Sequence, residues 1–280
     1  MKNILIYIKE RFPILPALIY CVLFILTIFD FFQNYNPINI FLLTVSLFLF
    51  LFSIRLQDEI KDYQYDNQKH RERPLQRGII SLEAIKNLLL ITIIIQVSIQ
   101  AVFFFEYFRI FLIIAFYNLM IFKEFFIKKF LDNHIFIYLI SHQFIFFLII
   151  YYFMQIASHK NLEFNRTAVL FSISLFFVPL LWEIGRKIKH RYSSNNAPTD
   201  DTYVYYLGRK KAFAFLILLF IAQTLLILSY KQQYTFPLAL YFGAIISIIA
   251  VYLQKPKPIY NQSPNWSAGL SLFSLIVMLS

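Results

Sequence analysis

The part of the chain best suited to chemistry is a short acidic run. Glu59, Asp62 and Asp66 lie three and then four positions apart, so on a helix these carboxylates share one face, and Asp58 lies one position round from them. Carboxylates stacked in this way repel one another unless a cation lies between them. Mg²⁺ prefers oxygen ligands and usually takes one or two carboxylates together with phosphate oxygens and water. These four acids are therefore candidate Mg²⁺ ligands, and Asp62 and Asp66 are also candidate catalytic residues.

Basic side chains follow the acidic run within a few residues. Arg71, Arg73 and Arg77 are the candidates for binding a diphosphate, because guanidinium groups form strong charge-assisted hydrogen bonds to phosphate oxygens. The whole run therefore predicts a site for a metal ion and a diphosphate. The alternative is an ordinary solvated loop of mixed charge.

The elements that must position this run are apolar helices. The chain is 59% hydrophobic, and a helix of roughly 20 apolar residues crosses a bilayer. The runs are apolar all round rather than alternating, which favours helices over the strands of a barrel. We therefore predict an all-α, polytopic membrane protein with about nine transmembrane helices in one bundle, over residues 12–32, 38–55, 81–105, 107–122, 134–158, 166–183, 212–230, 235–253 and 266–280.

The distribution of positive charge predicts the orientation. With nine spans, one side of the membrane holds every Lys and Arg except Arg109, Lys160, Arg166 and Lys231. Because positive residues stay cytoplasmic, we expect a cytoplasmic N-terminus in the cell (inner) membrane. This topology explains the net charge of +11 without a nucleic-acid partner.

Two long charged loops, at 55–81 and 183–211, look like counterparts within a single domain of residues 1–280. Each begins with an acid at the end of an apolar helix and ends with Leu and Gly, at Gly78 and Gly208, near the next apolar run. Duplicated halves of membrane proteins commonly place a site at their interface. We therefore expect the two loops to cap a shared cytoplasmic site.

The string D-E-x-x-D-x-x-x-D at positions 58–66, followed by R-P-L-x-x-G at 73–78, resembles the first aspartate-rich motif of the UbiA superfamily of membrane prenyltransferases, such as the 4-hydroxybenzoate polyprenyltransferases. The resemblance implies a helical bundle in which Mg²⁺ bridges two acidic motifs and an isoprenyl diphosphate. Ionisation of this donor leaves an allylic carbocation, which an aromatic or other lipophilic acceptor attacks. The resemblance thus implies a prenyltransferase of isoprenoid biosynthesis.

The second motif departs from the family pattern D-x-x-x-D. Glu183 stands at the first acid, as a candidate catalytic residue and metal ligand, but Lys187 stands at the second, and a metal cannot bind an ammonium. Lys187, with Arg186 beside it, can contact the diphosphate directly while Asp201 (or Asp200) restores a metal-binding acid. The alternative is a degraded site, with a different donor or with catalysis lost.

Polar residues in two other spans are weaker candidates. Asn118 and Lys123 loosely resemble polar residues of the family's fourth helix and are assigned to diphosphate binding, although Lys123 and Glu124 can equally cap a helix at the interface. His142, near the middle of the fifth span, is costly in lipid and should face the bundle. It can act as a general base or simply pack.

Two other functions keep the same fold. A phosphoribosyl-type transferase acting on polyprenyl phosphate would suit the basic second loop, and a non-catalytic lipid-binding protein would need no intact motif. Transport is disfavoured, because the spans offer almost no ionisable residues through mid-membrane.

Overall fold

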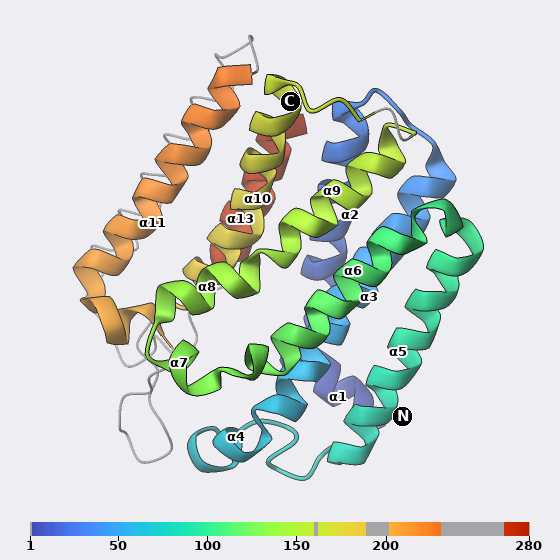
Figure 1. Cartoon of the computed structure of the whole chain (residues 1–280). Helices are drawn as coiled ribbons and strands as arrows, with labels where there is room; N and C mark the ends of the chain where they lie inside the picture. The colour runs from blue at the N-terminus through green and yellow to red at the C-terminus, as the bar shows by residue number, and fades with distance from the viewer. Residues whose placement is uncertain (1, 160–161, 189–201, 231–265, 280) are drawn as a thin grey trace. The chain divides into compact units, whose positions relative to one another are not determined.

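The computed structural model describes residues 2–159, 162–188, 202–230 and 266–279. Throughout these residues the secondary structure consists of α-helices and short 3₁₀ turns, with no strand (Figure 1). The prediction of an all-α protein is confirmed.

The chain divides into two compact units, Met1–Leu162 and Glu163–Ser280. The prediction of a single domain is not tested by this division and stays a prediction. The first unit contains α1 (Lys2–Arg11), α2 (Ile14–Phe31), α3 (Pro37–Lys61), α4 (Tyr63–Lys69), α5 (Leu82–Phe103), α6 (Phe108–Phe122), α7 (Lys128–Asp132), α8 (Ile135–Gln143) and α9 (Ile145–Ala157), with 3₁₀ turns η1 (Phe105–Tyr107) and η2 (Glu124–Phe126). The second unit contains α10 (Arg166–Arg186), α11 (Tyr203–Tyr230) and α13 (Trp266–Leu279).

Seven helical segments within the described residues are long and apolar enough to cross a membrane, and they correspond to the first seven predicted spans. Large apolar side chains such as Leu90, Val102 and Phe116 are more than half exposed, as expected for surfaces that contact lipid. The polytopic prediction is thereby confirmed. The eighth predicted span, 235–253, lies outside the described residues, and the helix at the ninth has 14 described residues, so the count of nine stays a prediction.

Helix α3 carries the beginning of the first acidic motif. Pro37 occupies its first turn, and Asn36 caps it by accepting hydrogen bonds from the backbone N–H groups of Ile38 and Asn39, both at 3.1 Å. The helix ends at Lys61, beyond the predicted span boundary at 55, and the short helix α4 follows at once. The acidic motif therefore continues out of the span on helical backbone, as expected.

A small apolar cluster fixes the segment that follows the acidic motif. Tyr7 of α1 is fully buried against Leu56, Leu75, Ile80 and Ile85. Two of these residues belong to the loop between α4 and α5, so α1 packs directly on that loop. Close packing of this kind leaves the loop little freedom to move.

The two loops that look like counterparts in the sequence share a backbone feature. Gly78 and Gly208 adopt left-handed conformations with φ of +74° and +73°, which side chains disfavour. Gly208 interrupts α11 near its beginning. A left-handed glycine thus precedes α5 in the first loop and interrupts the first turns of α11 in the second.

A buried glutamine ties the helices of the second unit together. The Gln223 side-chain amide donates to the Ser174 carbonyl at 3.1 Å, and the Ser274 hydroxyl donates to the Gln223 side-chain carbonyl at 3.1 Å. These bonds join α11 to α10 and to α13. Polar groups buried among apolar helices need such partners, so Gln223 has a structural explanation.

Candidate functional site

The four acids of the first motif do not share one environment. Asp58 and Glu59 lie in the last turn of α3, Asp62 lies at the junction with α4, and Asp66 lies within α4. Each of them meets different neighbours, and these neighbours decide which carboxylates are open to a metal.

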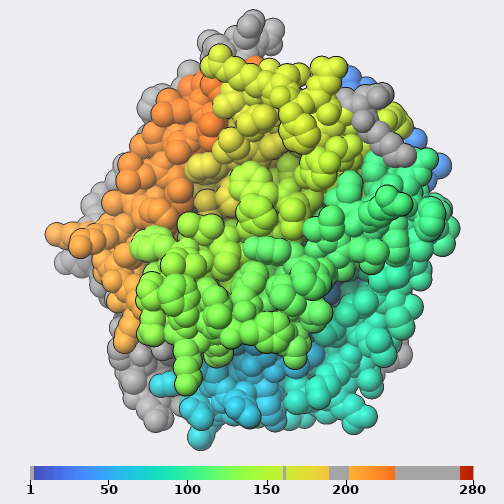
Figure 2. Space-filling model, in the orientation of Figure 1, coloured from blue at the N-terminus to red at the C-terminus, as the bar shows by residue number. Residues whose placement is uncertain are grey.

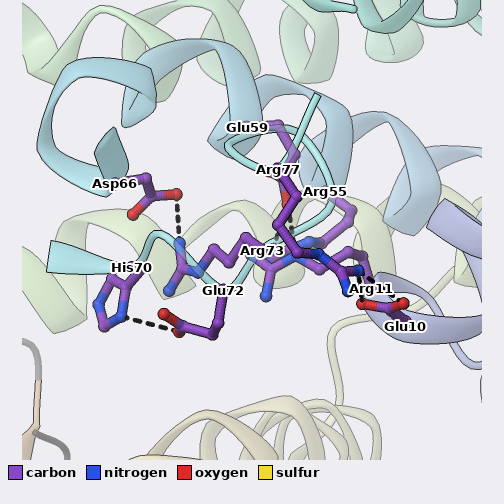
Figure 3. A network of polar contacts seen from close by, with 9 residues as sticks. All are labelled: Glu10, Arg11, Arg55, Glu59, Asp66, His70, Glu72, Arg73 and Arg77. Atoms are coloured by element: carbon purple, nitrogen blue, oxygen red, sulfur yellow. Dashed lines mark hydrogen bonds and ion pairs between the residues drawn. The ribbon is translucent and has the colours of Figure 1, made fainter. Parts of the chain in front are cut away.

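Glu59 is held by two arginines. Its Oε1 accepts a hydrogen bond from Arg11 Nε at 2.8 Å and from Arg55 Nη2 at 2.5 Å, and its side chain is fully buried (Figure 3). The carboxylate is thus directed at the end of α1 and is already neutralised. This geometry supports a structural role for Glu59, and its assignment as a metal ligand stays a prediction.

We expect Glu59→Gln to lower the free energy of unfolding by about 1–3 kcal/mol, because it weakens charge-assisted hydrogen bonds to two arginines. Thermal unfolding in detergent measures this loss. Glu10→Gln is the matched control, since Glu10 lies in α1 beside Arg11 and forms a half-exposed ion pair with Arg77. Breaking this pair should change the free energy of unfolding by less than about 1 kcal/mol. Equal losses for the two variants would contradict the structural role of Glu59.

Two of the predicted diphosphate-binding arginines also hold carboxylates. Arg73 donates from Nη1 to Asp66 Oδ2, and Arg77 donates to both oxygens of Glu10, at 2.6 and 2.7 Å (Figure 3). Burial raises the pKa of Asp66 although Arg73 opposes the shift. Arg71 is exposed, and its Nε donates to the Asn67 carbonyl at 3.2 Å. Arg73 and Arg77 therefore brace the loop, whereas Arg71 pairs with no carboxylate among the residues that the structure describes.

Asp62 is the motif acid that no described cation pairs with within 4 Å. Burial raises the pKa of Asp62 to about 6, with help from the charges of Asp58 and Asp66, although the charge of Lys61 opposes the shift. Asp58 is the more exposed neighbour, and its Oδ1 lies 3.8 Å from Lys61 Nζ. The described residues contain no group of three or more acidic, His or Cys side chains placed around one metal position, but Mg²⁺ needs only one or two carboxylates. The assignment of Asp58 and Asp62 as ligands of one such ion stays a prediction.

An ion pair that the sequence did not predict lies beside these aspartates. Glu124, in the turn between α6 and α7, is 5% exposed, and its Oε1 lies 2.9 Å from Lys61 Nζ. The surface of the α7 and α8 segment accordingly adjoins that of the α4 region (Figure 2). His142 Nε2 lies 3.5 Å from the other Glu124 oxygen. Although burial opposes the shift, His142 and Lys61 lower the pKa of Glu124 to about 2.

The backbone of this turn is strained. Glu124, Phe125 and Phe126 have φ values of 50°, 51° and 60°, and left-handed residues other than glycine cost about 1–3 kcal/mol each. The Phe125 ring contacts Tyr117 and His142, with centroids 5.5 and 6.0 Å away. Strain of this kind persists only where surrounding contacts compensate for it, and it is concentrated at functional positions.

His142 packs as well as facing Glu124. Its Nδ1 lies 2.9 Å from the Tyr138 carbonyl and its ring stacks on the Tyr138 ring at 3.9 Å, so Nδ1 carries a proton and donates. Lys123 is exposed, with its ammonium 5.4 Å from the Phe122 ring. The Asn118 Oδ1 atom is buried with no hydrogen-bond partner among the described residues. The roles of Asn118 and Lys123 in diphosphate binding stay predictions.

The second motif presents cations around its acid. Glu183 Oε2 accepts from Arg186 Nε at 2.6 Å, and Lys187 Nζ lies 2.8 Å from Glu183 Oε1. Both oxygens are occupied, so this end of α10 fits an anion better than a metal ion. Asp201, the acid predicted to enter from the loop, lies outside the described residues.

Comparison with known proteins agrees with the motif. The model of the UbiA prenyltransferase family matches residues 11–275. Comparisons with curated proteins and with solved structures found no match. The matched region covers nearly all of the chain and contains both acidic motifs. The chain belongs to the UbiA prenyltransferase family.

Proposed function

We propose that this protein transfers a prenyl group from an isoprenyl diphosphate to an aromatic or other lipophilic acceptor, in a Mg²⁺-dependent reaction in the cell membrane. The observation that carries the proposal is the pair of Asp58 and Asp62 at the end of a membrane-spanning helix in a chain of this family. Among the motif acids that the structure describes, Asp62 has no ion-pair partner within 4 Å. A N-terminus on the cytoplasmic side is part of the same proposal.

The residues have separate tasks in this reaction. Mg²⁺, when bound by Asp58 and Asp62, neutralises negative charge on the departing diphosphate. Lys187 and Arg186 are fixed cations suited to phosphate oxygens. A carbocation formed among the apolar helices would be protected from hydrolysis, because closed apolar sites exclude water.

A second donor is phosphoribosyl diphosphate, with polyprenyl phosphate as the acceptor. The cations around Glu183 favour this candidate, because a donor with more phosphate groups gains more from fixed positive charge. Its product keeps the polyprenyl phosphate, so the two reactions are readily distinguished.

The test is an incubation of the purified protein with Mg²⁺ and a panel of isoprenyl diphosphates and acceptors, with phosphoribosyl diphosphate and polyprenyl phosphate in parallel. We expect release of diphosphate together with a new prenylated product in the organic extract. Release with phosphoribosyl diphosphate alone would favour the second candidate. No product from any combination would favour a non-catalytic lipid-binding protein.

A further inference from the structure

Lys61 lies between two sets of carboxylates. Its Nζ is 2.9 Å from Glu124 Oε1 and 3.8 Å from Asp58 Oδ1, and Asp62 is the next residue along the chain. Its side chain is 11% exposed, so water screens these interactions only weakly. The position of this one ammonium therefore affects the electrostatic potential at the carboxylates of Asp58 and Asp62.

An ammonium and a divalent cation compete for the same carboxylate oxygens. If Lys61 paired closely with Asp58 or Asp62, it would occupy a position that the metal needs as a ligand. The shorter distance to Glu124 shows that the ammonium is drawn toward the turn between α6 and α7 instead.

Glu124 has the surroundings of a fixed anchor for this ammonium. The Glu124 residue is 5% exposed. Its Oε2 lies 3.5 Å from His142 Nε2, and its Oε1 lies 4.0 Å from Lys128 Nζ. The left-handed backbone of Glu124, Phe125 and Phe126 brings the carboxylate to this position. A residue that only capped a helix at the interface would need neither burial nor a strained backbone.

We propose that Glu124 is a positioning residue that draws the Lys61 ammonium toward itself, so that Lys61 forms no close hydrogen bond to Asp58 or Asp62 and a divalent cation can displace it from these aspartates. The inference rests on the proposed function only in taking Asp58 and Asp62 as the metal site. It predicts that metal affinity depends on Glu124 through Lys61.

The test measures Mn²⁺ binding to the purified full-length protein in detergent, without substrate, by electron paramagnetic resonance. Glu124→Gln should weaken binding on the order of tenfold, because the released ammonium forms a charge-assisted hydrogen bond to an aspartate that the metal must then displace. Lys61→Met should bind Mn²⁺ at least as tightly as the wild type. The double variant should recover the affinity that Glu124→Gln loses. Lys128→Met is the matched control, since Lys128 also neighbours Glu124 but is 62% exposed, and it should leave the affinity nearly unchanged.

The outcomes separate this inference from the proposed function. Wild-type Mn²⁺ affinity in Glu124→Gln would overturn the inference. A double variant that binds Mn²⁺ as weakly as Glu124→Gln would also overturn it, because Glu124 would then act through the fold rather than through Lys61. If Glu124→Gln does not fold, weaker binding by Lys61→Met would also overturn the inference. Absence of Mn²⁺ binding by the wild type would overturn both the inference and the metal site. Mn²⁺ binding that follows the expected series without any prenyl transfer would overturn the proposed function alone.

Discussion

Asp62→Asn is expected to abolish Mg²⁺-dependent release of diphosphate and at the same time to stabilise the protein at neutral pH. The substitution removes an anionic ligand from the proposed metal site, and losses of such electrostatic groups typically lower turnover by roughly 10²- to 10³-fold. It also removes a half-buried carboxylate that forms no ion pair within 4 Å among the described residues and whose burial outweighs the nearby charge of Lys61. A residue that costs stability and supports turnover is typical of an active site.

The effect on stability has a definite pH dependence. The pKa of Asp62 is raised to about 6, above the ordinary value of about 3.9. Between these values the folded protein holds a proton that the unfolded chain has lost, so the free energy of unfolding falls as the pH rises from about 4 to about 6. At pH 7 the asparagine variant should therefore be more stable, by on the order of 1–3 kcal/mol, and the difference should vanish near pH 4. Thermal unfolding at the two pH values measures it.

Asp66→Asn is the matched control for Asp62→Asn. Asp66 is buried and paired with Arg73, so its substitution leaves an arginine without its carboxylate and should destabilise the protein rather than stabilise it. Normal turnover in both variants would mean that these acids are only structural or solvated charges. If Asp62→Asn lost stability at pH 7, the Asp62 carboxylate would be stabilised by its surroundings, and the raised pKa would be contradicted.

Lys187→Ala is expected to weaken donor binding by roughly 10- to 150-fold. A charge-assisted hydrogen bond contributes about 1.5–3 kcal/mol, and every 1.4 kcal/mol is about tenfold in affinity. Glu183 keeps Arg186 as a partner in this variant, so the acid is not left without a cation. The measurement is donor affinity by titration across a series of Mg²⁺ concentrations.

Lys187→Asp separates direct contact with the diphosphate from a degraded second motif. It should bind donor more weakly than Lys187→Ala at low Mg²⁺, because it adds negative charge. High Mg²⁺ should partly restore binding, since an aspartate four residues after Glu183 recreates the acid pair of the family motif. Arg186→Ala is the control on the same acid, and because Arg186 is more exposed than Lys187 its effect should be smaller. Equal affinities in all the proteins would place Lys187 outside the site and favour the degraded motif.

The family, the fold class and the first seven spans were predictable from the sequence. The length of an apolar run decides whether a helix crosses a bilayer, and the chain supplies that information locally. The motif string at 58–66 predicted the family because its spacing and its downstream arginine, proline and glycine stand close together in the sequence. The replacement of the second acid of the other motif by Lys187 could also be recognised from the sequence alone.

The partners of the motif acids were decided by the tertiary structure. Helical spacing places Glu59 and Asp62 on neighbouring positions of one face, but Glu59 pairs with Arg11, 48 residues away, because α1 packs on the loop that follows the motif. Lys61 and Glu124 are 63 positions apart in the sequence, and they meet at a turn whose left-handed backbone the sequence did not predict. Local spacing determines which side chains share a helix face, whereas long-range packing determines which charges neutralise them and therefore which carboxylates stay open to a metal.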